Sequence, residues 1–214
     1  MLDTAKPSVT SDPTIFVIDD NEDFRVALVA LLSSMNMLTK SFESARQFLA
    51  QPVHDGPGCI LLDVRMPGLS GLDLQDQLER IGSRIPIIFI TGHGDIPMTV
   101  RALKAGASDF IEKPFREQAL LDAVTTALAR SEESRKSASE VEVARALAAT
   151  LTPREREVMA VVCKGLMNKQ IAYALGIQEI TVKIHRGNVM RKMQVRSVAE
   201  LIRRSDLLTQ LEPA

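Results

Sequence analysis

The first two thirds of the chain alternate short apolar runs with amphipathic stretches. The runs have the length of strands, and the stretches repeat apolar residues at the three- and four-residue spacing of helices. Three runs, at 15–18, 59–62 and 87–90, are apolar throughout, as strands are when helices cover both faces of a parallel sheet. This repeated strand-helix pattern predicts an α/β fold. The expected strands are 14–19, 38–42, 59–62, 87–90 and 108–111, and the expected helices are 22–34, 45–49, 71–80, 97–105 and 117–130.

The last third of the chain has a helical pattern only, and its first helix has a clear start. Thr152 is expected to cap that helix, Pro153 to take its first position, and Glu155 to reach back to the amide of the cap. The apolar positions then continue to Gly165, which is expected to stop the helix in a left-handed conformation.

Two further helices follow around a glycine. Asn168 is expected to cap a short helix, and Gly176 permits a tight turn before a third helix from about Glu179 to Met193. Two helices joined by a glycine-containing turn predict a small all-α helix-turn-helix domain.

A polar segment joins the two halves. Residues 131–150 are rich in Ser, Ala, Glu and Arg and contain neither Gly nor Pro, which favours a helical linker. Val141, Ala144, Leu147 and Leu151 fall on one face, either as a short coiled-coil seam between two subunits or as part of a monomeric linker helix. The expected organisation is a flexible N-terminus at 1–13, an α/β domain at 14–130, the linker at 131–150 and the helix-turn-helix domain at 151–208.

Three carboxylates end two of the apolar runs. Asp19 and Asp20 follow the first run, and Asp63 ends the run at 59–62. If the two runs are neighbouring parallel strands, all three acids converge at the carboxyl edge of the sheet, where open α/β sheets place their sites. Such acids repel one another, and Mg²⁺, which takes oxygen ligands and keeps several waters, would relieve that repulsion.

A hydroxyl and an ammonium stand at the ends of the next two runs. Thr91 follows the run at 87–90, and Lys113 follows Phe110 and Ile111. Both groups can form hydrogen bonds with the oxygens of a phosphorylated aspartate. The sequence therefore predicts phosphoryl chemistry at this edge.

Residues 14–115 resemble the receiver domain of two-component response regulators, because Asp19, Asp20, Asp63, Thr91 and Lys113 all stand at the expected strand ends. Thr91 lies 28 residues and Lys113 lies 50 residues after Asp63, which is the spacing of the FixJ/StyR branch of the FixJ/NarL type. The resemblance implies a flavodoxin-like fold with a five-stranded parallel sheet of order 2-1-3-4-5. It also implies that Asp63 accepts a phosphoryl group from a sensor histidine kinase.

The same resemblance implies further roles around that aspartate. Asp20 and Asp63 would bind Mg²⁺ directly, Asp19 would do so through water, and the backbone carbonyl of Arg65 would complete the protein's share. After phosphorylation Thr91 would move inward and Phe110 would enter the space it leaves. The bond from Lys113 to Pro114 is expected to be cis.

Residues 150–204 resemble the LuxR-type DNA-binding domain, through Leu151 to Glu155, Asn168 to Ala172, Thr181 to His185, and Arg196-Ser197. In the third helix Val182, Val189 and Met193 repeat at helical spacing and should face the core. The positions where this family reads bases are Lys183, Ile184 and Gly187.

Other basic residues are better suited to contacts with DNA phosphates, which position a domain without specifying sequence. The candidates are Lys169, His185, Arg186, Arg191 and Lys192, and simple solvation is the alternative for each. The family pattern also suggests an ion pair between Glu155 and Arg196.

The distribution of charge supports an α/β domain that does not bind DNA and a second domain that does. Residues 14–115 carry 9 Lys and Arg against 13 Asp and Glu, whereas residues 151–204 carry 11 against 4. A basic second domain is typical of nucleic-acid binding. No apolar stretch reaches the length of a membrane span, the start is polar, and Cys59 and Cys163 are interpreted as packing residues, so a cytoplasmic protein is expected.

Two histidines fall in polar loops. His54 is interpreted as a solvated residue of the loop at 51–58. His93 is interpreted as a loop residue as well, and the alternative is that it tunes access to the acyl phosphate.

The sequence thus predicts a DNA-binding regulator that is activated by phosphorylation and uses Mg²⁺. Its expected partners are a sensor histidine kinase, a second copy of the chain on phosphorylation, double-stranded promoter DNA with paired half-sites, and RNA polymerase, with no membrane partner. Two alternatives stay open: constitutive DNA binding with a receiver that serves only for dimerisation, and an aspartate-nucleophile phosphatase. The phosphatase is disfavoured because Arg65 stands where such enzymes usually have a second acid.

Overall fold

A computed structural model describes residues 12–209 apart from 53, 55 and 93–95, and the chain divides into two compact units, Met1–Arg135 and Lys136–Ala214. Most of the expected flexible N-terminus and the expected role of His93 lie outside the described residues. Each unit is treated separately below.

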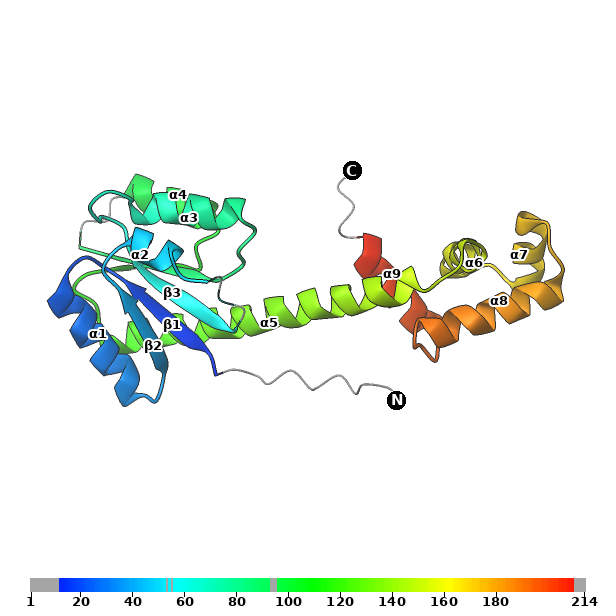
Figure 1. Ribbon diagram of the computed structural model, residues 1–214, viewed down its shortest axis with the longest axis horizontal. Coiled ribbons are helices and arrows are strands. Elements are labelled where there is room, and N and C mark those ends of the chain that lie inside the picture. The colour runs from blue at the N-terminus through cyan, green and yellow to red at the C-terminus, as the bar shows by residue number, and fades with distance from the viewer. Residues whose placement is uncertain (1–11, 53, 55, 93–95, 210–214) are drawn as a thin grey trace. The chain divides into compact units, whose positions relative to one another are not determined.

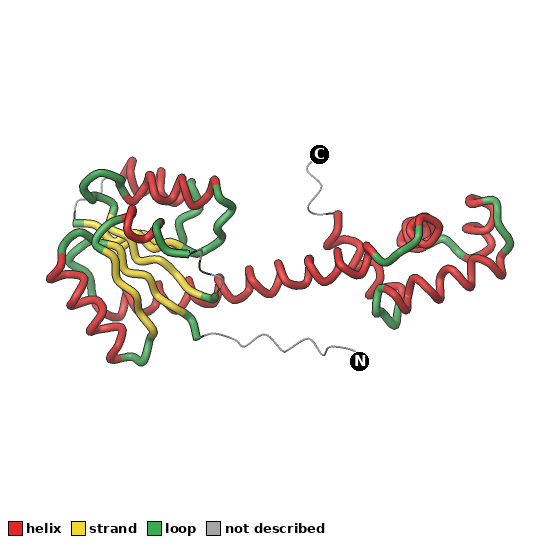
Figure 2. The backbone as a smooth tube through the Cα atoms, in the orientation of Figure 1, coloured by secondary structure: helices red, strands yellow, loops and turns green. Residues whose placement is uncertain are grey.

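The first unit is built on one parallel sheet. Its strands have the order β2-β1-β3-β4-β5, and every neighbouring pair is parallel, which confirms the predicted topology. Figure 2 shows the strands side by side with helices on either face. The strands are β1 (Thr14–Ile18), β2 (Leu38–Phe42), β3 (Gly58–Asp63), β4 (Ile87–Thr91) and β5 (Asp109–Glu112).

The helices of this unit cover both faces of the sheet, as Figure 1 shows for α1 and α5 on one face and α2, α3 and α4 on the other. They are α1 (Glu22–Ser34), α2 (Ala45–Leu49), α3 (Gly71–Arg80), α4 (Ile96–Lys104) and α5 (Glu117–Ala149).

Alternate residues of each strand pack into two separate cores, because successive side chains of a strand point to opposite faces of the sheet. Ile15 and Val17 belong to the core beneath α1 and α5, and Phe16 and Ile18 to the core beneath α2, α3 and α4. Cys59 is fully buried in the first of these cores, and burial raises the pKa of its thiol to about 12, as suits a packing residue.

Helix α5 is longer than the helix expected at 117–130, because it also includes the segment expected to be a helical linker. Its Ser131 still belongs to the first unit: the side chain is buried, and its Oγ accepts a hydrogen bond of 3.1 Å from the Gly58 amide. A Cβ at position 58 would lie 2.3 Å from the carbonyl oxygen of Thr14, so the start of β3 requires glycine.

The second unit is helical. The predicted capping box is confirmed: Thr152 Oγ1 accepts from the Glu155 amide at 3.3 Å, and Glu155 Oε2 accepts from the Thr152 amide at 2.9 Å. Gly165 and Gly176 have the expected left-handed backbone, with φ of 81° and 62°. Its helices are α6 (Pro153–Cys163), α7 (Asn168–Leu175), α8 (Glu179–Lys192) and α9 (Val198–Thr209), besides the end of α5.

The apolar stripe near the end of α5 is used inside the second unit. Ala144 is fully buried, and Leu147 and Leu151 pack in the core formed by α6 to α9. This burial favours the single linker helix over a coiled-coil seam between subunits. Within the described part of the chain, no helix is both long enough and apolar enough to cross a bilayer.

Candidate functional site

Four of the five strand-end residues predicted from the sequence gather at the carboxyl edge of the sheet. Asp19 follows β1, Asp63 ends β3, Thr91 ends β4 and Lys113 follows β5. Since β1 and β3 are adjacent parallel strands, their ends lie side by side. The fifth residue, Asp20, is exposed and makes no hydrogen bond or ion pair within the described residues.

The ammonium of Lys113 joins the two buried carboxylates. Its Nζ lies 2.6 Å from Asp19 Oδ2 and 3.0 Å from Asp63 Oδ1. The backbone amide of Lys113 donates a hydrogen bond of 2.8 Å to the carbonyl of Thr91, which ties the ends of β4 and β5 together. The bond between Lys113 and Pro114 is cis, as predicted.

The carboxylate of Asp63 is held in an environment that disfavours its charge. The residue is only 8% exposed, and its Oδ2 accepts a hydrogen bond of 2.7 Å from the Arg65 amide. Burial raises the pKa of Asp63 above its ordinary value, and the charge of Asp19 adds to that rise. The hydrogen bond and charge of Lys113 oppose the rise, as does the Arg65 amide.

Asp19 is fixed even more tightly. It is 2% exposed, its Oδ1 accepts from the Asn21 amide at 2.9 Å, and its carbonyl oxygen accepts from Arg25 Nη1 at 2.7 Å. The side chain of Asn21 in turn caps α1 by accepting from the Phe24 amide at 3.0 Å. The loop after β1 is therefore held in place by its own hydrogen bonds.

The donor set at this edge fits a hard divalent cation. Three carboxylates, those of Asp19, Asp20 and Asp63, stand at this edge with the ammonium of Lys113, and the guanidinium of Arg25 binds the carbonyl oxygen of Asp19. The carboxylates of these residues offer oxygen donors, which are the ligands that Mg²⁺ prefers. Within the described residues, no group of three or more Asp, Glu, His or Cys side chains is placed to hold a metal ion.

The predicted switch residues lie beside this site. Thr91 is 1% exposed at the end of β4. Phe110 is half-buried on β5 and packs against the core beneath α2, α3 and α4, with its ring centroid 6.3 Å from that of Phe89.

Sequence reasoning missed two residues that shape the site. The ring of Phe24 lies under Lys113, with Nζ 3.7 Å from the ring centroid. At Gly71, the first residue of α3, a Cβ would lie 2.3 Å from the carbonyl oxygen of Asp63, so only glycine lets this helix come this close to the end of β3. Phe24 lies in the first turn of α1, where an aromatic residue gives no signal of a role at the site.

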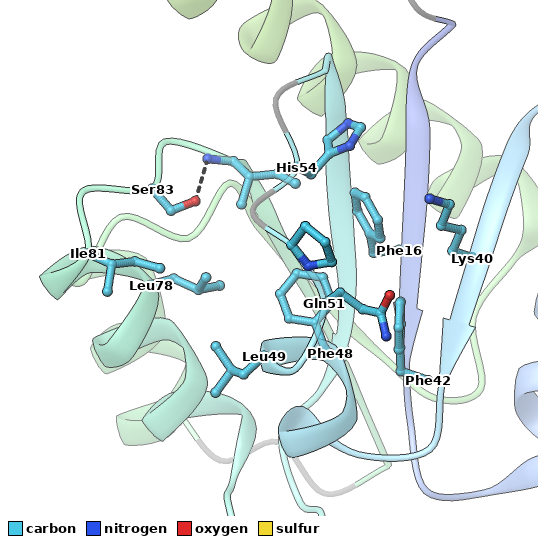
Figure 3. A pocket seen from close by; sticks show the side chains of 12 residues that line it. Phe16, Lys40, Phe42, Phe48, Leu49, Gln51, His54, Leu78, Ile81 and Ser83 are labelled. Atoms are coloured by element: carbon cyan, nitrogen blue, oxygen red, sulfur yellow. Dashed lines mark hydrogen bonds between the residues drawn. The ribbon is translucent and has the colours of Figure 1, made fainter.

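A hollow of about 300 Å³ elsewhere in the first unit contains none of the predicted site residues. Figure 3 shows the rings of Phe16, Phe42 and Phe48 grouped beside His54. The prediction that His54 is simply solvated is wrong, because its half-buried ring packs edge-on against Phe16 at 4.9 Å and its Nε2 lies 3.1 Å from the carbonyl oxygen of Pro57.

In the second unit, α8 has the two faces that the sequence predicted. Val182, Val189 and Met193 are buried in the core. The side chain of Lys183 is 59% exposed, and the residue Ile184 is also 59% exposed. A Cβ added at Gly187 would meet nothing within 4 Å. The outer face of α8 is thus open for contact with another molecule.

The basic residues predicted to contact phosphates have different surroundings. Lys169 and Arg191 are exposed, and Arg191 Nη2 donates to Asn188 Oδ1 at 3.0 Å. Arg186 and His185 are half-buried, and Arg186 Nη1 donates to Asn168 Oδ1 at 3.0 Å.

The predicted cap of α7 is wrong. Asn168 is the first residue of the helix and Met167 is the cap residue, because the Asn168 side chain is engaged by Arg186 of α8. The Met167 amide instead donates to Gln170 Oε1 at 2.8 Å. The bond between Asn168 and Arg186 links the two helices of the helix-turn-helix.

The predicted ion pair of Glu155 has a different partner. Lys192 Nζ lies 2.7 Å from Glu155 Oε2 and also donates to the carbonyl of Thr150 at 3.0 Å, whereas Arg196 forms no ion pair with Glu155 in the described structure. The hydrogen bond from Lys192, with that from the Thr152 amide, lowers the pKa of Glu155 to about 2. Lys192 is therefore a structural residue of this unit, and its suggested phosphate contact would have to compete with this pair.

Comparison with known proteins covers both units. Residues 15–125 match the family model described as the response regulator receiver domain, and residues 149–205 match that of the bacterial regulatory proteins of the luxR family.

Two relatives match along most of their length. Nodulation protein W of Bradyrhizobium diazoefficiens is 53% identical over 194 residues, covering 91% of this chain and 86% of the relative. The transcriptional regulatory protein FixJ of Azorhizobium caulinodans is 44% identical over 201 residues, covering 94% of each chain.

Two solved structures are similar in fold. The response regulator StyR superposes with a TM-score of 0.81 and 48% identity, covering 92% of this chain and 99% of that one. Full-length FixJ from B. japonicum has a TM-score of 0.58 and 39% identity, covering 95% and 100%.

Proposed function

Because this chain belongs to the FixJ/NarL-type response regulators, which join a receiver domain to a LuxR-type DNA-binding domain, we propose that Asp63 is the phosphoryl acceptor through which it regulates transcription. The protein is a phosphorylation-dependent transcriptional regulator of a two-component system.

One observation carries the assignment of Asp63. Its carboxylate is buried at the end of β3, shares the ammonium of Lys113 with Asp19, and has a raised pKa. Burial is the first cause of that rise, and a buried carboxylate is a better nucleophile than one stabilised by water. Asp19 and Asp20 have other surroundings: the first is fixed by Asn21 and Lys113, and the second is exposed.

The transfer forms one bond and breaks one. A carboxylate oxygen of Asp63 attacks the phosphorus of a phosphohistidine on the sensor kinase, the P–N bond breaks, and the imidazole leaves with the electron pair. Lys113 and the Thr91 hydroxyl then stabilise the charge on the phosphoryl oxygens. Lys113 is already at the correct carboxylate, 3.0 Å from Asp63 Oδ1.

Mg²⁺ is the proposed cofactor. The residues that would hold it are Asp20 and Asp63 directly, the carbonyl of Arg65, and Asp19 through water. Bound there, the ion supplies positive charge next to the incoming phosphoryl oxygens.

The proposed switch is a change in population between two forms of the receiver. A phosphoryl group on Asp63 draws Thr91 toward it, and Phe110 moves into the space that Thr91 leaves. The half-buried state of Phe110 supports this role, because the ring has room to become more deeply buried. The active form dimerises.

The proposed DNA-reading surface is the outer face of α8. Lys183 donates to guanine, Ile184 contacts a thymine methyl, and Gly187 lets the helix approach closely. The side chains proposed for phosphates are Lys169, His185, Arg186 and Arg191.

The proposed partners are those implied by the two matched domains and by the DNA-reading face of α8. They are a sensor histidine kinase, promoter DNA with paired half-sites read by a two-fold dimer, and RNA polymerase, all in the cytoplasm. A turnover enzyme is not proposed, because Arg65 stands two residues after Asp63 where aspartate phosphatases usually have a second acid.

Peptide mass spectrometry after incubation with acetyl phosphate and Mg²⁺ tests the acceptor. The expected result is a single phosphoryl group on the peptide that contains Asp63, with no label in Asp63→Asn. Label on another residue, or equal labelling of the variant, would refute the assignment.

A further inference from the structure

The ammonium of Lys113 lies over an aromatic ring as well as between two carboxylates. Its Nζ is 3.7 Å from the centroid of the Phe24 ring, well within the range of about 6 Å over which a cation is attracted to the face of a ring. The Lys113 side chain is 22% exposed, so this attraction is only partly screened by water. The contact is therefore strong enough to influence where the ammonium stays.

The ring of Phe24 is itself fixed. Its backbone amide is bound by the Asn21 side chain at the start of α1, at 3.0 Å, and its ring meets that of Phe115 edge to face, with centroids 6.1 Å apart and planes at 87°. Asn21 also donates to Asp19, the other partner of Lys113. A closed series of contacts thus runs from Asp19 through Asn21 and Phe24 to Lys113 and back to Asp19.

An aromatic face differs from a further carboxylate in one respect that matters here. It attracts the ammonium without accepting a directed hydrogen bond of the strength that an oxygen would form. The N–H groups of Lys113 thus remain available to oxygens, those of Asp63 before transfer and those of the phosphoryl group after it. A third acid in place of the ring would hold the ammonium away from the acceptor.

We propose that Phe24 is a positioning residue that holds the ammonium of Lys113 at Asp63 for phosphoryl transfer. This role rests on the proposed function of Asp63 and extends it to a residue outside the strand-end set. Without the aromatic face, Lys113 is held by Asp19 and Asp63 alone, and the shorter contact, to Asp19, draws the ammonium away from Asp63. A displaced ammonium compensates the phosphoryl oxygens less well.

Three substitutions test the role in the full-length protein. Phe24→Leu keeps an apolar side chain of similar size but removes the ring, whereas Phe24→Tyr keeps the ring. Phe48→Leu is the matched control, because it makes the same change in the aromatic group of the other core, away from Lys113.

The first readout is independent of phosphorylation. Protons near the Lys113 ammonium should show an upfield ring-current shift in NMR spectra of the wild-type protein and of Phe24→Tyr. The shift should disappear in Phe24→Leu and persist in Phe48→Leu. Absence of the shift in the wild type would overturn the proposal.

The second readout is the rate of phosphorylation by acetyl phosphate with Mg²⁺, in which Asp63 attacks phosphorus and acetate leaves with the electron pair. Phe24→Leu should be slower by about threefold to tenfold, the size expected of a partly desolvated cation–π contact, and Phe24→Tyr should stay near the wild-type rate. Equal rates for Phe24→Leu and Phe24→Tyr would overturn the positioning role, as would equal slowing in Phe48→Leu.

Failure of the proposed function gives a different result. If the wild-type protein takes no label at Asp63, the proposed function and the positioning role are both wrong. A ring-current shift that is still present in that protein then shows that Phe24 contacts Lys113, so the failure lies in the assignment of Asp63. If Phe24→Leu does not fold, its NMR spectrum loses the dispersion of a folded protein. In that case, wild-type protein with a fluorinated Phe24 ring is used in place of the Phe24→Leu variant. Fluorine weakens the negative face with little change of shape, so the rate should fall with each added fluorine, and a constant rate would overturn the proposal.

Discussion

At the scale of single residues, the chemistry follows from an imbalance of charge. Three acids stand at one sheet edge with one lysine, and the lysine reaches only Asp19 and Asp63. The raised pKa of Asp63 has burial as its first cause, and burial together with the charge of Asp19 outweighs the hydrogen bonds from Lys113 and the Arg65 amide and the charge of Lys113. A divalent cation would offset part of this negative charge, and for that reason Mg²⁺ is the proposed cofactor.

Mg²⁺ is therefore expected to stabilise the protein against heat. A ligand that binds only the folded form at one hundred times its dissociation constant adds about 2.7 kcal/mol to the free energy of unfolding. Thermal unfolding followed by circular dichroism should show a rise of several degrees for the wild type and little rise for Asp63→Asn. Glu43→Gln, which removes an exposed acid from the loop after β2, should keep the full rise.

The response should also depend on pH. Because the pKa of Asp63 is raised, protons compete with Mg²⁺ at a higher pH than they would at an ordinary aspartate. A rise in melting temperature that is equal in Asp63→Asn, or that is unaffected by acid, would contradict the account of this site.

The residues of the site differ in how visible they are in the sequence. Asp19, Asp63 and Lys113 could be found because each follows an apolar run, and parallel strands bring such ends to one edge. Phe24 could not, since an aromatic residue in the first turn of a helix is usually interpreted as packing. The partner of Glu155 was also misassigned, because Lys192 and Arg196 are four residues apart and only the end of α8 decides which one is within reach.

At the scale of elements, the start of α6 is held by a pair of contacts to one carboxylate. Glu155 accepts from the Thr152 amide and from Lys192 of α8, so it both caps one helix and joins it to another. Those bonds lower the pKa of Glu155 to about 2. A depressed pKa means that the stabilisation is present above the ordinary value and is lost as the pH falls toward 2.

Glu155→Gln keeps an oxygen that can accept from the Thr152 amide but removes the charge that pairs with Lys192, so it should destabilise the DNA-binding unit by about 1 kcal/mol or more at neutral pH. The difference from the wild type should shrink between about pH 5 and pH 2. Urea unfolding followed by the fluorescence anisotropy of Tyr173, the only tyrosine and a residue of α7, reports on this unit.

A matched variant on the same helix sharpens the comparison. Glu157 pairs with Arg154 at the surface, and its side chain is 51% exposed, so Glu157→Gln should change stability by less than about 0.5 kcal/mol. Equal effects of the two variants at neutral pH would show that Glu155 has no special role.

The outer face of α8 makes a second prediction at this scale. Lys183→Ala should cost about 1 to 3 kcal/mol of DNA affinity and relax the preference at one base pair, as expected of a base contact. Lys169→Ala, on α7, should weaken binding to all sequences alike and lower the salt dependence by about one charge. Fluorescence anisotropy with promoter and random DNA distinguishes the two patterns, and a uniform loss in Lys183→Ala would contradict base reading.

The predicted elements agree with the structure within about a residue where periodicity was strong, as for α1, α2 and α3. The predicted end of the α/β domain near residue 130 falls inside α5, and two features explain why the sequence hides the boundary. The first is that periodicity cannot show where a single helix leaves one core and enters another. The second is that the hydrogen bond from the Gly58 amide is accepted by Ser131, a small polar residue that does not stand out within a polar segment.

At the scale of the whole molecule, phosphorylation and DNA reading are assigned to different units of one chain. The proposed acceptor, Asp63, lies in Met1–Arg135, and the proposed DNA-reading face of α8 lies in Lys136–Ala214. Phosphorylation and DNA binding are coupled by one free energy, which is the same for the effect of phosphorylation on DNA binding and for the reverse effect. DNA that favours the active form therefore also favours the phosphorylated form. A tenfold change in DNA affinity requires about 1.4 kcal/mol of such coupling.

The affinity for promoter DNA with and without acetyl phosphate and Mg²⁺, measured by fluorescence anisotropy on the wild type and Asp63→Asn, tests this coupling most directly. We expect the phosphodonor to tighten binding by the wild type at least tenfold and to leave Asp63→Asn unchanged. Tight binding by the unphosphorylated wild type with no response to the donor, or an equal response in Asp63→Asn, would contradict a switch at this aspartate.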